Sequence, residues 1–181
     1  MELTEKIQKR ETIYAGKIMT VQKDFVVLPN GEDSTREIVI LNGASAVLPI
    51  DDEGNVLLVR QYRCPFSEIL LEIPAGKLDS PDEDPYLCAK RELKEETGAE
   101  AENIEFLMKT YPSPGVLKEV LYLYMAKGLH FGERHLDDDE FLDVVKVPLK
   151  TAYEYINTGK IVDAKTIIAL LLYKNLKGEN F

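Results

Sequence analysis

The feature that most constrains the fold is a strongly marked helix at residues 85–97. Pro85 is at the position where the first helical turn favours proline, and Asp84 before it is a residue type that caps helices. Gly98 follows at the position where helices commonly end. These signals predict a helix of about three turns.

The predicted helix carries three carboxylates on one side. Glu92, Glu95 and Glu96 fall within an arc of about 100°. Like charges at these spacings repel one another. The arrangement is stable if the carboxylates face water, as most acidic runs do, or if a divalent cation neutralises them through oxygen ligands. The surrounding sequence has to decide between a solvated face and a metal site.

Composition narrows the class of protein. The chain has 181 residues, of which 45% are hydrophobic and 30% charged, as in an ordinary soluble globular protein with one domain and a small appendage. The net charge of −10 and the lack of a lysine or arginine cluster argue against nucleic acid and membrane surfaces as partners. Cys64 and Cys88 are too few for a zinc site or a disulfide scaffold. The opening residues lack the apolar core of a signal peptide, so we expect a cytoplasmic protein.

The remaining segments predict a mixed α/β protein. Strands are predicted at 18–28, 36–41, 44–50, 55–63, 69–73, 104–111, 119–126 and 141–147. Two further helices are predicted at 149–157 and 165–176, and 128–140 is predicted to be a mobile loop. The first two strands predict a small N-terminal antiparallel sheet at 1–43. The rest, 44–181, predicts an α/β/α sandwich with a mixed β-sheet.

The segment from Gly76 to Gly98 resembles the Nudix box. That motif is a glycine, a glutamate, and then the run Arg-Glu-aliphatic-x-Glu-Glu-x-Gly, which this chain carries intact from Arg91 onward. Glu83 is separated from Arg91 by seven residues, as the family pattern requires, but from Gly76 by six rather than five. We expect the loop before the helix to absorb this extra residue.

The resemblance implies a metal site and favours it over a solvated helix face. By analogy with the family, Mg²⁺ or Mn²⁺ would be bound by Glu92, Glu96 and the backbone carbonyl of Ala75. Glu95 would be a further ligand or a catalytic base. Glu83 and Arg91 would hold the helix and the preceding loop in register. Pyrophosphate hydrolysis needs charge neutralisation and an activated water, which divalent ions provide.

A second resemblance covers nearly the whole chain and is to the ADP-ribose pyrophosphatase subfamily. Pro114 lies sixteen residues after Gly98, a spacing that marks this subfamily. The other matching segments are Arg36-Glu37, Gln61-Tyr62-Arg63, residues 71–77, Ser113-Pro114-Gly115 with Glu119 beyond, and residues 159–166. Each segment is weak evidence alone, but together they indicate the subfamily.

This second resemblance implies the substrate contacts. Arg63 would contact the substrate diphosphate, although a surface charge at a strand end would look the same. Arg36 and Glu37 would help to form the adenosine site, with an exposed cross-strand pair as the alternative. Pro114 and Glu119 would also contact substrate. The N-terminal sheet would be shared or exchanged in a homodimer and would contribute to the base site.

The acidic run 137–140 is a candidate for the catalytic base. Family members of this kind carry a glutamate on a mobile loop after the box, and Glu140 is the only glutamate of the run. Its neighbours Asp137, Asp138 and Asp139 could do the same work. The alternative is a solvated acidic loop.

The activity implied is Mg²⁺-dependent hydrolysis of ADP-ribose to AMP and ribose 5-phosphate. One alternative is a Nudix hydrolase for another nucleoside diphosphate sugar, such as GDP-mannose or ADP-glucose. The other is a sensor that binds ADP-ribose without hydrolysing it. Sensors typically lose box glutamates, and this chain keeps Glu92, Glu95 and Glu96.

Overall fold

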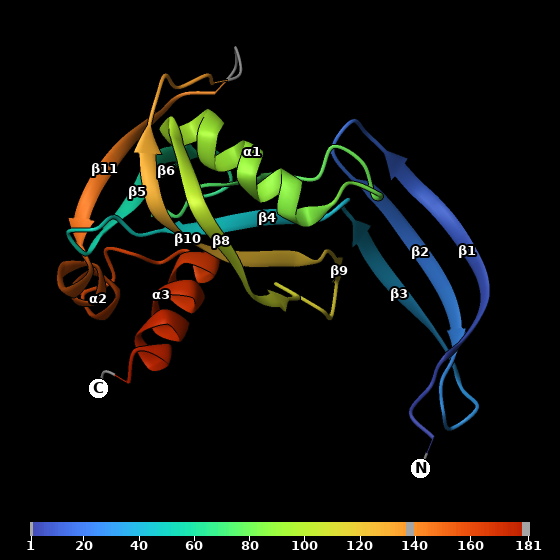
Figure 1. Cartoon of the computed structure of the whole chain (residues 1–181). Helices are drawn as coiled ribbons and strands as arrows, with labels where there is room; N and C mark the ends of the chain where they lie inside the picture. Colours follow the sequence, from blue (N-terminus) through green and yellow to red (C-terminus); the bar gives the residue numbers. More distant parts are fainter. Residues whose placement is uncertain (1, 137–139, 179–181) are drawn as a thin grey trace. The chain divides into compact units, whose positions relative to one another are not determined.

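The computed structural model describes residues 2–136 and 140–178 of the chain (Figure 1). The fold consists of two compact units. One is formed by Met1–Gly43 and Tyr111–Val120, and the other by Ala44–Thr110 and Leu121–Phe181. The segment 111–120 therefore packs with the N-terminal residues, although in the sequence it interrupts the second unit.

The first unit is a four-stranded sheet with the order β1-β2-β3-β9. Its strands are β1 (Lys6–Ala15), β2 (Thr20–Val27), β3 (Asp33–Ile40) and β9 (Leu117–Lys118). β1, β2 and β3 are antiparallel neighbours, and β9 runs parallel to β3. The turn after β2 places Gly31 at φ 88°, a left-handed conformation that glycine adopts without strain. The predicted N-terminal hairpin is confirmed as β2 and β3.

Strand β1 is not predicted by the sequence, because its residues are mostly polar and show no apolar alternation. All of its side chains except one are exposed. The strand is held by backbone pairing with β2 and by an ion pair that joins the two strands. Arg10 donates from Nε and Nη2 to the two carboxylate oxygens of the buried Asp24, each at 2.7 Å. Tertiary pairing thus creates a strand where local propensity is weak.

In its described residues, the second unit contains two sheets and three helices. The mixed sheet has the order β7-β4-β10-β8, with strands β7 (Ala75–Lys77), β4 (Ala44–Pro49), β10 (Leu121–Phe131) and β8 (Ala99–Thr110). The antiparallel sheet has the order β11-β5-β6, with strands β11 (Leu142–Pro148), β5 (Asn55–Arg63) and β6 (Glu68–Glu72). The helices are α1 (Pro85–Thr97), α2 (Leu149–Asn157) and α3 (Ala164–Leu176).

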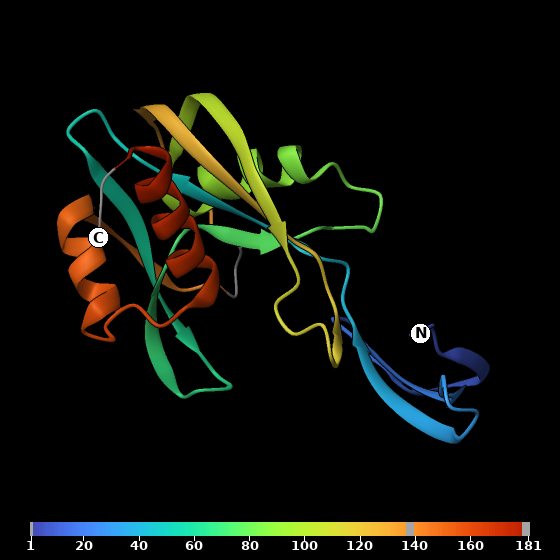
Figure 2. The ribbon, with the colours of Figure 1, turned by 90° about the horizontal axis from the view of Figure 1, so that it is seen from below.

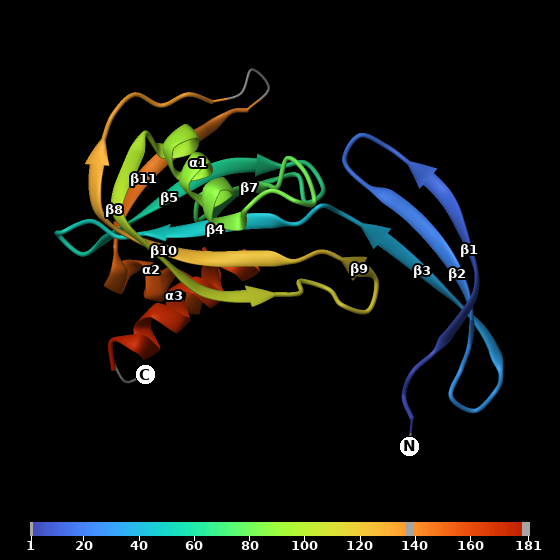
Figure 3. The same cartoon turned by 45° about the vertical axis from the view of Figure 1, so that its right-hand side comes forward.

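The mixed sheet is covered by a helix on each face. Val47 of β4 packs with Ala89 and Leu93 of α1, whereas Leu48 belongs to the same buried cluster as Leu170 of α3. Neighbouring residues of a strand point to opposite faces, so α1 and α3 lie on opposite sides of the sheet. Figures 1 and 3 show α1 on one side of the mixed sheet and α3 on the other. Figure 2 shows α2 (orange) next to α3 (red). The predicted α/β/α sandwich is confirmed.

Several elements differ from the sequence-based predictions. Strand β10 extends to Phe131, so the predicted loop at 128–140 begins four residues too early. Strand β8 begins at Ala99 rather than at 104, because its first residues pair with the end of β10. Residues 75–77, for which the sequence predicts no strand, pair with β4 as the short strand β7. In each case the partner strand supplies the order that the local sequence lacks.

Among the described residues, no helix has both the length and the apolar character needed to cross a bilayer.

Candidate active site

Helix α1 begins and ends where the sequence predicts. The side chain of Asp84 accepts a hydrogen bond from the backbone N–H of Tyr86 at 2.9 Å, and Pro85 occupies the first turn. Gly98 adopts φ 71° and donates its N–H to the carbonyl of Lys94 at 2.8 Å. This is a left-handed helix cap, which glycine forms most readily. The register of the acidic residues on α1 is therefore set at both ends.

The three glutamates of α1 differ in exposure. Glu92 is 8% exposed and Glu96 is 1% exposed, whereas the Glu95 side chain is about one third exposed. A solvated helix face is therefore wrong for two of the three carboxylates. Burying a carboxylate without compensation is costly, so this part of the helix needs partners.

The segment that precedes the loop lies directly against these carboxylates. The backbone N–H of Ala75 donates to Glu96 Oε2 at 3.1 Å. A Cβ atom on Gly76 would lie 1.9 Å from Glu92 Oε1, so only glycine leaves room for this carboxylate. The structure thus brings Ala75, Glu92 and Glu96 together around the start of β7.

Arg91 holds the acidic face and the loop together. Its Nη1 donates to Glu92 Oε1 at 2.6 Å and to Glu95 Oε2 at 2.9 Å, while Nη2 donates to the carbonyl of Lys77 at 3.2 Å. Glu83 Oε1 lies 3.6 Å from Nη2. Glu83 also accepts the backbone N–H of Asp79 at 2.5 Å, which closes the loop that contains the extra residue.

Burial changes the ionisation of this cluster. It raises the pKa of Glu92 to about 7, even though the charge of Arg91 lowers it. The pKa of Glu96 is raised to about 8, first by burial and then by the negative charges of Glu92 and Glu140. Burial lowers the pKa of Arg91, but the charge of Glu92 and the hydrogen bonds to Glu92 and Glu95 outweigh it and the net direction is upward. At neutral pH these two carboxyl groups would therefore be fully ionised only with additional positive charge beside them.

These donors fit a hard divalent cation in chemistry. Carboxylate oxygens and a backbone carbonyl are the ligands that Mg²⁺ and Mn²⁺ take in proteins. Within the described residues, no three acidic, histidine or cysteine side chains are already gathered as a ligand set. Glu95 is turned to Arg91, and Glu92 shares the same guanidinium group. Of the predicted ligands, Ala75 and Glu96 are joined by a hydrogen bond from the N–H of Ala75.

Arg63 is the last residue of β5, in the second unit. Its Nε and Nη2 donate to the two oxygens of Glu72 at 2.6 and 2.7 Å. Glu72 is 1% exposed and also pairs with Lys165. The hydrogen bond to Glu72 raises the pKa of Arg63 against the effect of burial, and the charges of Glu96 and Asp163 add to the rise. The alternative of a surface charge at a strand end does not describe this half-buried side chain.

Glu72 and Lys165, which lie beside the predicted site residue Arg63, are residues that the sequence analysis does not select. Both stand in segments that match the subfamily, but neither segment suggested a role. The available signal was a glutamate at the end of an apolar strand, and Glu72 is the one residue of β6 that is buried. A charged residue at such a position needs a buried partner.

Glu140 lies near the acidic face of α1. Its charge raises the pKa of both Glu92 and Glu96. Gln61 of β5 donates from Nε2 to Glu140 Oε1 at 3.4 Å. Glu140 also lines a cavity of about 360 Å³ with residues of β5, β6 and β11. The alternatives at 137–139 lie outside the described residues.

The other predicted substrate residues belong to the first unit. Arg36 donates from Nη1 to Ser34 Oγ at 3.0 Å and to the carbonyl of Thr35 at 2.9 Å, and it pairs with Glu5. Glu37 is exposed and lies opposite Lys23 in the register of β2 and β3. Pro114 lies in the turn closed by the N–H of Leu117 to the carbonyl of Ser113 at 2.8 Å, and Glu119 follows that turn. Their roles remain predictions.

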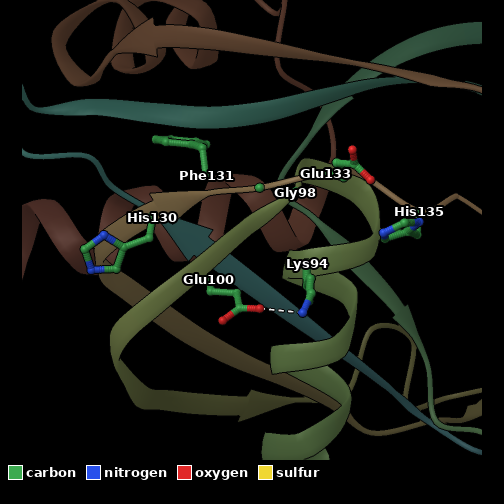
Figure 4. Close-up of a pocket in the computed structure, with 8 residues that line it drawn as sticks. Lys94, Gly98, Glu100, His130, Phe131, Glu133 and His135 are labelled. Carbon is green, nitrogen blue, oxygen red and sulfur yellow. Dashed lines mark ion pairs between the residues drawn. The ribbon is translucent and has the colours of Figure 1, made fainter.

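A separate cavity of about 390 Å³ lies at the C-terminal end of α1 (Figure 4). Lys94 and Glu100 form an ion pair of 2.5 Å at its edge, and His130 and His135 contribute to its lining. His130 pairs with Glu102 at 3.0 Å on the exposed surface of the β8–β10 hairpin. None of the predicted site residues lines this cavity.

Comparison with known proteins agrees with this geometry. Residues 41–170 match the family model described as the NUDIX domain, and residues 5–39 match the model described as the nucleoside diphosphate sugar hydrolase N-terminal domain. A crystal structure titled as that of an ADP compounds hydrolase superposes with a TM-score of 0.87, with 26% sequence identity and coverage of 99% of this chain and 100% of that one.

Three relatives are similar over most of their length. The methanol dehydrogenase activator of Bacillus methanolicus is 46% identical, covering 92% of this chain and 90% of that protein. The ADP-ribose pyrophosphatase of Bacillus subtilis (strain 168) is 41% identical, with coverage of 93% and 91%. A GDP-mannose pyrophosphatase of Yersinia enterocolitica is 36% identical, with coverage of 76% and 75%. The domain match and these identities establish that the chain belongs to the Nudix family.

Proposed function

We propose that this chain hydrolyses the diphosphate bridge of ADP-ribose to AMP and ribose 5-phosphate, with Mg²⁺ as the metal and Mn²⁺ as an alternative. The observation that carries the proposal is the burial of Glu92 and Glu96 against residues 75 and 76. Two such carboxyl groups need a cation to stay ionised at neutral pH. The choice of substrate is supported by the ADP-ribose pyrophosphatase of Bacillus subtilis, 41% identical over 93% of this chain.

In this proposal the start of β7 and the acidic face of α1 hold the metal. Glu92, Glu96 and the carbonyl of Ala75 would be the ligands, and Glu95 would be a further ligand or a base. A bound divalent ion would neutralise charge on the diphosphate and lower the pKa of a water molecule. Arg91 would keep the carboxylates in register through its bonds to Glu92 and Glu95.

Other side chains of the second unit would act on the substrate. Arg63 would bind the diphosphate and stabilise the charge that develops on its oxygens. Glu140 would accept a proton from the attacking water or orient it, and Gln61 would help to hold its carboxylate. Glu83 would act indirectly, through the loop that it closes with Asp79.

The first unit would recognise the adenosine part of the substrate. Arg36, Glu37, Pro114 and Glu119 are the residues proposed for this role. We also propose a homodimer that shares the N-terminal sheet, because β1 exposes nearly all of its side chains in one copy of the chain. A cytoplasmic location fits Cys64 and Cys88, which are both free thiols.

The test is a panel of substrates with Mg²⁺ in which the released mononucleotide is identified by chromatography. ADP-ribose, ADP-glucose, GDP-mannose and NAD would be compared by kcat/KM. The proposal expects AMP from ADP-ribose with the highest kcat/KM, and loss of that product in the Glu96→Gln variant. A preference for GDP-mannose, or equal rates in Glu96→Gln and wild type, would overturn it.

Two other functions have specific support. Hydrolysis of GDP-mannose is favoured by the Yersinia enterocolitica relative, 36% identical over 76% of this chain. Activation of an alcohol dehydrogenase is favoured by the Bacillus methanolicus relative, at 46% identity. Adding the chain to a methanol dehydrogenase assay tests the second, with Glu96→Gln showing whether activation needs hydrolysis. A sensor without activity is disfavoured, since all three glutamates of α1 are kept.

A further inference from the structure

We propose that the first turn of α3 positions both Arg63 and the segment 72–75, with Lys165 and Thr166 as the positioning residues. The inference rests on the proposed function, in which Arg63 contacts the diphosphate and Ala75 offers a carbonyl to the metal. Residues 159–166 match the subfamily, but the match alone assigns them no function. The proposal assigns a positioning function to the last two residues of that segment.

The Lys165 side chain acts on Arg63 through a buried carboxylate. Glu72 receives the Nε and Nη2 atoms of Arg63 at 2.6 and 2.7 Å, one on each oxygen, and Lys165 Nζ contacts the same Oε2 that binds Nη2. Two parallel bonds to a carboxylate fix the plane of a guanidinium group. They leave Nη1, the third nitrogen of Arg63, to face another acceptor. Lys165 thus fixes Glu72, and Glu72 fixes the direction of Arg63.

Thr166 fixes the backbone beside the same carboxylate. Its Oγ1 accepts the N–H of Ile73 at 2.8 Å and donates to Asp163 Oδ2 at 2.6 Å. Two residues further along, the N–H of Ala75 donates to Glu96 at 3.1 Å. The segment 72–75 is therefore tied to α3 at its beginning and to α1 at its end.

Capping of α3 alone does not require these contacts. Asp163 caps the helix by accepting the N–H of Thr166 at 3.0 Å, which is sufficient for that purpose. Yet Asp163 also binds Lys165 Nζ at 3.0 Å, and Lys165 and Thr166 then reach residues 93 positions earlier in the chain. A buried ion pair contributes little net stability compared with apolar packing. Its geometry, directed at Arg63, is better explained by orientation of that side chain.

The first experiment measures binding of a non-hydrolysable α,β-methylene analogue of ADP-ribose by calorimetry with Mg²⁺ present. Lys165→Met keeps the length of the side chain and removes its charge. We expect affinity to fall roughly tenfold, Lys165→Arg to recover most of it, and Lys174→Met on the last turn of α3 to leave it unchanged. In an Arg63→Met background, Lys165→Met should cause no further loss, because its effect passes through Arg63. Equal losses in both backgrounds would overturn the proposal.

The second experiment measures Mn²⁺ binding by electron paramagnetic resonance, without substrate or turnover. Thr166→Val has nearly the shape of threonine, but its side chain cannot bond Ile73 or Asp163 and only the backbone bond to Asp163 is kept. Thr166→Ser keeps the hydroxyl. We expect Mn²⁺ affinity to fall several-fold in the valine variant only. Loss of unfolding free energy with unchanged Mn²⁺ affinity would assign Thr166 a merely structural role. Failure of the wild-type protein to hydrolyse ADP-ribose would instead refute the proposed function. That outcome does not depend on either binding experiment.

Discussion

Glu96 is a carboxylic acid that folding removes almost completely from water, at 1% exposure. Burying such a group is unfavourable unless hydrogen bonds or an opposite charge offset the free energy of its desolvation. The N–H of Ala75 supplies one hydrogen bond, and the neighbouring charges of Glu92 and Glu140 make ionisation harder rather than easier. An ionised Glu96 therefore lowers the free energy of unfolding unless a cation beside it offsets the charge.

Replacing Glu96 by glutamine should separate activity from stability. We expect turnover of ADP-ribose to fall by at least about 100-fold, since an amide is a poor ligand for Mg²⁺. The free energy of unfolding of the metal-free protein should be unchanged or higher, because glutamine carries no charge to desolvate. Steady-state kinetics and urea unfolding measure the two effects. Glu100→Gln, which alters an exposed carboxylate, is the matched control, and a loss below tenfold in Glu96→Gln would remove Glu96 from the ligands.

Gly76 predicts a similar separation by a steric route. A methyl group at this position would overlap the Glu92 carboxylate, with Cβ only 1.9 Å from Oε1. Because a side-chain end can swing away, we expect Gly76→Ala to fold but to displace Glu92. Mn²⁺ affinity should then fall roughly tenfold or more. Gly115→Ala, where no atom lies within 4 Å of the new Cβ, serves as control. Unchanged Mn²⁺ affinity would show that Glu92 is not a ligand.

The raised pKa values of Glu92 and Glu96 predict how stability changes with pH. In the unfolded chain both groups lose their protons near pH 4.5, whereas in the fold they hold them up to about 7 and about 8. The folded state therefore binds more protons between pH 4.5 and 8, and the unfolding free energy contributed by this pair falls as pH rises through that window. We expect a loss of more than ~1 kcal/mol between pH 6 and 8.5 in the presence of EDTA.

Urea unfolding at several pH values measures this effect. Mg²⁺ should reduce the loss, because it binds only the ionised carboxylates of the folded protein. Glu96→Gln should flatten the profile without metal. A metal-free profile that rises from pH 6 to pH 8.5, in both wild type and Glu96→Gln, would contradict the assignment.

Among the elements, α1 is the one whose ends matter most for the site. Gly98 adopts φ 71°, and a Cβ there would lie 2.6 Å from the backbone oxygen of Gly132. Gly98→Ala would place a side chain on a left-handed backbone and against a backbone atom that cannot easily move. We therefore expect it to lower the free energy of unfolding by about 1 kcal/mol or more. Thermal and urea unfolding measure the change. Gly132→Ala, whose Cβ would make only an ordinary contact at 3.7 Å, should be nearly neutral. Equal effects of the two substitutions would argue against the cap.

At the scale of the whole molecule, the exposed strand β1 predicts a dimer. Its ten residues place Ile7, Ile13 and Tyr14 on the surface. A long exposed edge strand with apolar side chains is rarely left uncovered. We expect sedimentation equilibrium to give twice the monomer mass, and Ile7→Glu with Ile13→Glu to raise the dissociation constant roughly tenfold or more. Leu176→Glu, an exposed apolar position on α3, is the control. A monomeric wild type would refute the shared sheet.

Prediction from sequence succeeded where the signals are local. Asp84, Pro85 and Gly98 give the ends of α1 because capping depends on a few neighbouring residues. The hairpin β2–β3 is predicted by its β-prone residues and by the turn residues Pro29-Asn30-Gly31, whereas β1 is mostly polar. The beginning of β8 and the end of β10 were missed for the same reason, since each is ordered mainly by pairing with the other.

The sequence by itself determined the Nudix box, its helix and the carboxylates that share one face, because motif, caps and period are all short-range properties. Only the tertiary structure decided that Glu92 and Glu96 are buried while the Glu95 side chain is about one third exposed. It also decided that Lys165 lies beside Glu72, 93 residues away in sequence. Burial and long-range ion pairs depend on which surfaces pack together, and no local pattern in the chain encodes that distance.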